Sequence, residues 1–147
     1  MGLFDSLFGG MEGSGKLSPQ ESFAGILLGA SACDGHIADD EVQSLFTALL
    51  RMKLYQRLNE RQFQQAIQKV HGLLKKKGVD VLLDACTATL PPELAKSAFT
   101  NACDIVMADG VVEDDEKQFI EKLRAKLKIE PETAKTIARV MVIKNKG

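Results

Sequence analysis

The chain has 147 residues, 45% of them hydrophobic, which is enough for one domain with a substantial core. Its net charge of −1 argues against a nucleic-acid partner, because binding to the phosphate backbone requires a basic surface. Three cysteines without C-x-x-C spacing or a preceding signal peptide predict reduced thiols in a cytoplasmic protein, and no apolar run is long enough to span a bilayer.

The first 17 residues form a segment that we expect to lie outside the globular domain at 18–147. A short amphipathic piece at 3–8 places four apolar side chains on one helical face, and a linker with four glycines follows at 9–15. The four apolar residues are Leu3, Phe4, Leu7 and Phe8. This piece would bind a membrane surface weakly, dock on a partner or pack on its own domain.

Start and stop signals divide residues 18–147 into six or seven helices. Capping boxes occur at Ser18 and Asn59, glycines stand at the expected helix ends, and apolar residues recur at intervals of three and four between them. We expect Ser18, Asp39 and Asn59 to be the cap residues before three of the helices, and the other helices to begin at Val79, Pro91, Glu113 and Pro131. Because no segment alternates apolar and polar residues convincingly, we predict an all-α fold, a single helical bundle.

One ten-residue motif occurs twice. The stretch Asp34–Gln43 returns 75 positions later as Asp109–Gln118, with six of ten positions identical. Each copy reads D-G-x-[IV]-x-D-D-E between two expected helices, so the bundle should contain two pseudo-symmetric helix–turn–helix units. Gly35 and Gly110 would supply a positive φ, and the aliphatic residue two positions later would anchor the turn in the core.

The motif matches only the second half of an EF-hand loop. Glycine stands at the sixth position, an aliphatic residue at the eighth and glutamate at the twelfth. The first and third positions, which need aspartate, are Ala30 and Ala32 in one copy and Ile105 and Met107 in the other. Two independent EF-hands are therefore excluded, and two partial oxygen sites are left.

Two interpretations of these acidic turns stay open. Asp34 and Asp109 follow helix C-termini, where the helix dipole disfavours a carboxylate, so a bound cation would explain them. If the two units pack face to face, Asp34, Glu41, Asp109 and Glu116 would form one cluster of hard oxygen ligands, suited to Ca²⁺, Mg²⁺ or Mn²⁺. In the other interpretation the carboxylates only cap the next helix.

The repeated motif resembles the signature A-D-G-x-[IV]-x-x-x-E of the TerB-like family of tellurite-resistance and stress-response proteins. The resemblance covers the chain from about Ser18 onward, with Cys33 in place of the first alanine. It implies a helical bundle with pseudo-symmetric halves, partners that are often membrane-associated, and candidate metal ligands in both turns. The ligands that it implies are Asp34, Asp40, Glu41, Asp109, Asp115 and Glu116.

The leading functional prediction is a non-enzymatic, cytoplasmic stress-response module, peripheral to the inner membrane at most, that binds a divalent cation through its acidic turns. We expect a protein partner as well and no nucleotide, since Gly10–Lys16 matches a P-loop only up to its lysine and no strand precedes it. One alternative is a helical protein–protein interaction domain whose turns are structural caps. The other is a metal-dependent hydrolase, which needs a pocket beside the carboxylates.

Overall fold

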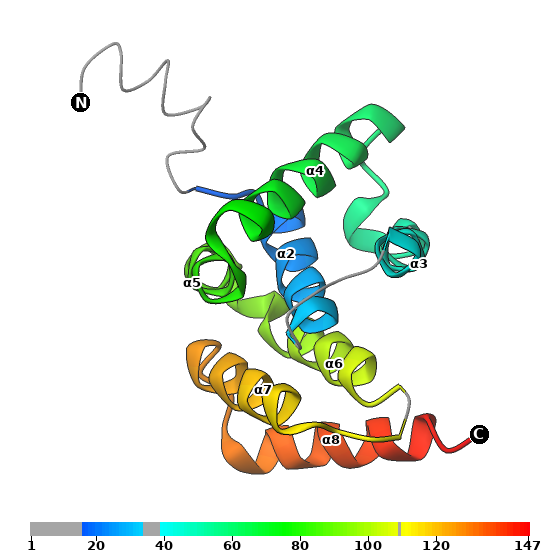
Figure 1. Cartoon of the computed structure of the whole chain (residues 1–147), viewed down its shortest axis with the longest axis vertical. Helices are drawn as coiled ribbons and strands as arrows, with labels where there is room; N and C mark the ends of the chain where they lie inside the picture. Colours follow the sequence, from blue (N-terminus) through cyan, green and yellow to red (C-terminus); the bar gives the residue numbers. More distant parts are fainter. Residues whose placement is uncertain (1–15, 34–38, 109) are drawn as a thin grey trace.

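The computed structural model describes residues 16–33, 39–108 and 110–147. Over these residues the chain is all-helical, with seven α-helices, two short 3-10 helices and no strand, which confirms the predicted fold class (Figure 1). In chain order the elements are α2 (Pro19–Ala32), α3 (Asp39–Leu50), η2 (Lys53–Tyr55), α4 (Glu60–Lys77), α5 (Val79–Thr89), η3 (Pro92–Leu94), α6 (Ala95–Val106), α7 (Asp114–Lys126) and α8 (Pro131–Lys144). The amphipathic piece at 3–8 and its linker lie outside the described residues.

Local signals in the sequence set the predicted helix ends. At the start of α2 the Ser18 amide donates to Glu21 Oε1 (2.8 Å) and the Glu21 amide donates to Ser18 Oγ (3.1 Å). Asn59 and Gln62 form the same reciprocal pair before α4, at 3.0 and 2.8 Å. Gly78, with φ +88°, ends α4, as a residue without a β-carbon can. Both capping boxes and this stop were predicted and are confirmed.

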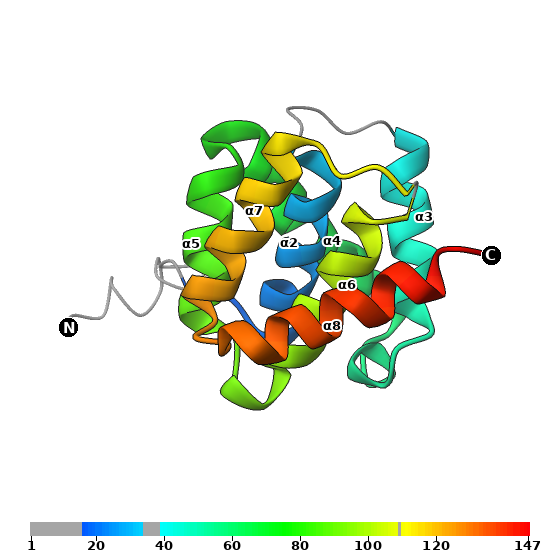
Figure 2. The ribbon, with the colours of Figure 1, turned by 90° about the horizontal axis from the view of Figure 1, so that it is seen from below.

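Helix α2 is the centre of the bundle. Ten of its 14 residues are buried, because beyond its first turn the sequence carries no charged side chain. It packs against α4, α5 and α6, and Figure 2 shows α5 and α7 on one side of it and α3 on the other. Phe23, Ile26 and Leu28 are at most 1% exposed, and burial of each contributes about 1.5–3 kcal/mol.

Two predicted helix starts differ from the structure. α6 begins at Ala95, not at Pro91, because a residue that precedes a proline avoids the helical conformation, and Pro91 before Pro92 has ψ 138°. The chain then makes a 3-10 turn, in which the Leu94 amide donates to the Pro91 carbonyl (2.9 Å). α3 begins at Asp39, so this aspartate is the first helical residue and not the residue before the helix. Neither change moves the acidic turns out of their place between two helices.

The two helix–turn–helix units are α2 with α3 and α6 with α7. Their incoming helices, α2 and α6, pack directly on each other near the centre of the bundle. Val112, the aliphatic residue of the second turn, is half-buried and packs against the core, as predicted. The counterpart residue Ile37 lies outside the described part of the chain. The pseudo-symmetry of the two units stays a prediction.

The last helix, α8, covers the outside of α6. Ala134 and Met141 are its buried residues, whereas Val140, Val142 and Ile143 are 49%, 48% and 69% exposed. None of the helices in residues 16–33, 39–108 and 110–147 has both the length and the apolar character that a membrane span requires.

Candidate functional site

Four of the six predicted metal ligands lie in the described part of the chain. Asp40 and Glu41 stand in the first turn of α3, and Asp115 and Glu116 in the first turn of α7. The positive end of the helix dipole favours carboxylates at these positions. The other two predicted ligands, Asp34 and Asp109, lie outside the described residues, as does His36.

Asp40 and Glu41 line a cleft between α2, α3 and α6. The cleft has a volume of about 440 Å³ and an apolar floor that includes Leu27 and Leu45. Its far wall is the last turn of α6, continuing to Ala108, the residue before Asp109. We call it the acidic cleft. The start of α3, which follows the first acidic turn, lies on one side of this cleft. The end of α6, which precedes the second acidic turn, lies on the other side.

The acidic cleft contains one carboxylate that the sequence analysis missed, Asp104. It lies near the C-terminus of α6, where the helix dipole disfavours a negative charge. Lys144 Nζ (3.1 Å) and Asn145 Nδ2 (2.9 Å) from the end of α8 both donate to Asp104 Oδ1. The unfavourable helix position was a readable signal, but the compensating residues are about 40 positions away and only the fold brings them near.

The second turn shows the reciprocal arrangement. Asp115 lines a smaller hollow of about 210 Å³ together with Cys33, the last described residue before the first turn. The start of α7 therefore lies beside the end of α2, and the start of α3 lies beside the end of α6. Each acidic helix start thus shares a hollow with the incoming helix of the other unit, so the described flanks of both turns lie at the same end of the α2–α6 pair.

Some of these carboxylates also make local hydrogen bonds. Glu116 Oε1 accepts from the Glu113 amide at 2.8 Å, so this residue caps α7 whether or not a metal binds. Asp40 Oδ1 accepts from the Glu41 amide at 3.1 Å. Among the side chains that the structure describes, no group of three or more histidine, cysteine, aspartate or glutamate residues is arranged to hold a metal ion. The described carboxylates offer oxygen atoms as metal ligands, which suit a hard cation, but a complete metal site needs further ligands.

Two of the three cysteines are buried and unreactive. Cys86 and Cys103 are fully buried, and burial raises the pKa of each thiol from its ordinary value of 9.0 to about 12. Both therefore serve as small buried hydrophobic residues of the core. Cys33 is partly exposed beside Asp115 in the small hollow.

The fold defines a class of protein: a small all-helical bundle with two helix–turn–helix units. The acidic start of the second helix in each unit lies beside the end of the first helix of the other unit. The model of the family described as "Tellurite resistance protein TerB" matches residues 20–139. Because this match covers most of the chain, the protein belongs to the TerB family. Comparison with curated proteins and with solved structures gave no match.

Proposed function

We propose that this TerB-family protein is a non-enzymatic module that binds a divalent cation where its two acidic turns leave the bundle. The observation that carries the proposal is the crossed arrangement of Asp40 and Glu41 beside the end of α6, and of Asp115 beside Cys33 at the end of α2. In the sequence, Asp34 follows the cleft residue Ser31 by three positions, and Asp109 directly follows the cleft residue Ala108. Short connections of this kind favour carboxylates from both turns meeting around one ion.

The chemistry of the donors supports Ca²⁺, Mg²⁺ or Mn²⁺. All six proposed ligands are carboxylates: Asp34, Asp40, Glu41, Asp109, Asp115 and Glu116. Hard divalent cations prefer such oxygens, whereas zinc prefers sulfur and nitrogen. A cation would also offset the repulsion among carboxylates gathered at one end of the molecule. The capping bond of Glu116 uses only one of its two oxygens and leaves the other for a ligand role.

Isothermal titration calorimetry of the full metal-free chain with each of the three cations tests the proposal. We expect saturable binding, with one ion per chain for a shared site and two for separate sites. Asp34→Asn, Asp109→Asn and Asp115→Asn should each weaken binding at least tenfold. Asp114→Asn is the matched control, because this exposed neighbour of Asp115 occupies the same helical turn without being a proposed ligand. Lack of saturable binding to all three cations would refute the proposal.

The exposed face of α8 favours a second candidate function, a protein–protein interaction domain. Val140 and Ile143 are one helical turn apart and 49% and 69% exposed, so α8 presents two neighbouring apolar side chains to solvent. The acidic cleft of about 440 Å³ is within the size range of small-molecule sites, but its volume alone does not favour the metal-dependent hydrolase. A partner that co-purifies equally well in chelator would support the interaction domain over the cation-binding module.

A further inference from the structure

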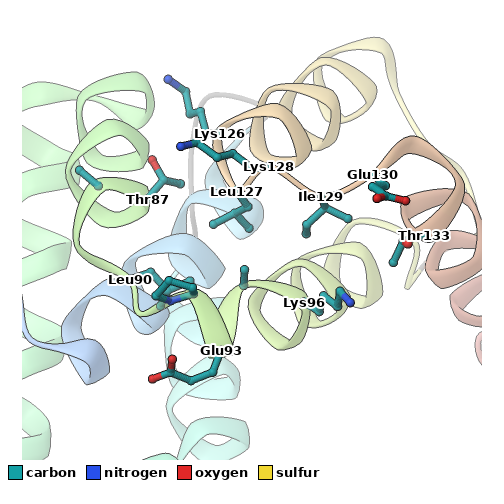
Figure 3. Close-up of a pocket in the computed structure, with 13 residues that line it drawn as sticks. Thr87, Leu90, Glu93, Lys96, Lys126, Leu127, Lys128, Ile129, Glu130 and Thr133 are labelled. Atoms are coloured by element: carbon teal, nitrogen blue, oxygen red, sulfur yellow. The ribbon is translucent and has the colours of Figure 1, made fainter.

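A second cleft lies where the ends of α5 and α7 meet the starts of α6 and α8 (Figure 3). Its volume is about 880 Å³, within the range of small-molecule sites. Leu90 and Ile129, which are 8% and 4% exposed, contribute to its apolar floor. Three lysines stand on its walls: Lys96, Lys126 and Lys128. We call it the basic cleft, and the cation-binding proposal does not involve it.

Lys128 occupies a backbone position that favours glycine. Its φ is +58°, the only positive value among the non-glycine residues that the structure describes. The Lys128 amide donates to the Ala125 carbonyl and the Ile129 amide to the Arg124 carbonyl, both at 3.1 Å, which closes the end of α7 as a Schellman-type cap. Helices that end with a residue in this conformation usually place glycine there, since a β-carbon is strained. A lysine at this strained position is therefore an exception to local backbone preferences.

Lys96 also stands where the local structure disfavours it. It lies in the first turn of α6, at the positive end of the helix dipole, where a cation is destabilising. Within residues 16–33, 39–108 and 110–147, neither Lys96 nor Lys128 forms an ion pair. Two lysines that break local rules therefore line the same cleft, and such exceptions tend to gather at functional sites.

The charges of the cleft favour an anion at one end. Figure 3 shows Lys126 and Lys128 extending toward the same side, near Thr87, with Glu93 and Glu130 at other edges of the cleft. Lys126 forms an ion pair with Asp84. Two lysines and one aspartate leave one positive charge uncompensated at this end, which attracts an anionic group such as a carboxylate or a phosphate monoester. Leu127 and Ile129 continue from that end along the cleft.

We propose that the basic cleft binds a single-chain anionic amphiphile from solution. Its carboxylate or phosphate lies against Lys126 and Lys128, and its apolar part covers Leu90 and Ile129. Charge complementarity selects the head group, because ammonium heads are repelled and neutral heads leave the lysine uncompensated. The concave apolar floor selects a ligand that has an apolar chain in addition to its charged head group, which inorganic phosphate lacks.

Calorimetric titration of the full chain with decanoate and with decyl phosphate tests this proposal. We expect saturable binding of both, and none of decyltrimethylammonium or inorganic phosphate. Lys128→Gly should weaken binding roughly three- to tenfold, the range for loss of a partly exposed charged contact. The same variant should melt at an equal or higher temperature than the wild type, because it removes a strained residue. Weaker binding without loss of stability separates a ligand contact from a folding defect.

Matched controls make the result specific to the cleft. Lys117→Gln changes an exposed lysine in the first half of α7, outside the cleft, and should leave the affinity unchanged. Added chelator should leave it unchanged as well, which keeps this result independent of the cation-binding proposal. Equal affinity for anionic and cationic amphiphiles, or an unchanged affinity in Lys128→Gly, overturns the proposal. Binding to phosphatidylglycerol vesicles without binding of free decanoate also overturns it, in favour of a membrane-binding surface.

Discussion

The sulfur of Cys86 in α5 occupies space that a β-carbon on Gly25 in α2 would need. An ideal β-carbon at Gly25 would lie 2.3 Å from Cys86 Sγ and 3.3 Å from Leu82 Cδ1. Cys86 and Leu82 are both fully buried, so neither side chain can turn away from Gly25 into solvent. The absence of a side chain at Gly25 therefore allows the close approach of α2 and α5, two helices of the central packing.

Gly25→Ala should destabilise the protein by roughly 1–3 kcal/mol, the usual cost of an added methyl group in a packed core. The gain in helix propensity, at most about 1 kcal/mol, offsets only part of it. Gly72→Ala in α4 is the matched control, because nothing lies within 4 Å of a β-carbon there, and it should stabilise the protein. Urea unfolding of both variants measures the difference. A Gly25→Ala variant as stable as Gly72→Ala would contradict the contact.

Stability should fall at high pH because Cys86 and Cys103 are buried. Burial raises the pKa of each thiol from 9.0 to about 12, whereas in the unfolded chain both keep their ordinary value. Between pH 9 and 12 the unfolded chain binds fewer protons than the folded one, so the free energy of unfolding decreases as pH rises. Below pH 9 the contribution is fully present. Each thiol adds at most about 1.4 kcal/mol per pH unit to this slope.

Cys103→Ala should make the pH dependence of stability flatter in that window, as measured by urea unfolding at several pH values. The same burial predicts that a thiol reagent at pH 8 modifies Cys33, which is partly exposed, well before the two buried cysteines. Rapid labelling of all three thiols in the folded protein would contradict the burial of Cys86 and Cys103.

Lys128→Gly should stabilise the fold by about 0.5–1 kcal/mol. The backbone at this position has φ +58°, which costs a lysine free energy and costs glycine almost none. The larger conformational freedom of glycine in the unfolded chain reduces the gain, which is why we expect no more than this. Thermal unfolding monitored by circular dichroism measures it. Lys128→Ala, which keeps the strained β-carbon but loses the amine, is the control and should not stabilise.

The hydrogen bond between Ser22 and Thr89 can be removed by substitution of either residue, and the two substitutions should lower the stability of the fold by different amounts. Ser22 is the one buried polar residue among those the structure describes, and its Oγ lies 2.6 Å from Thr89 Oγ1. Thr89 also donates to the Ala85 carbonyl at 2.8 Å, so Ser22→Ala leaves it satisfied and should cost about 1 kcal/mol. Thr89→Val leaves the buried Ser22 without this partner and should cost more, up to about 3 kcal/mol. Equal losses in chemical unfolding would argue against the asymmetry.

The sequence by itself determined the helical class, the capping boxes at Ser18 and Asn59 and the glycine stop at Gly78, because residues within a few positions of one another set these features. It also identified the family through the repeated acidic motif. It could not show that Asp104 joins Asp40 in one cleft, or that Lys96 and Lys128 line another, since these residues are 64 and 32 positions apart. Such proximity depends on how buried faces pack around α2, and helix periodicity specifies which faces are buried without specifying which partner covers each one.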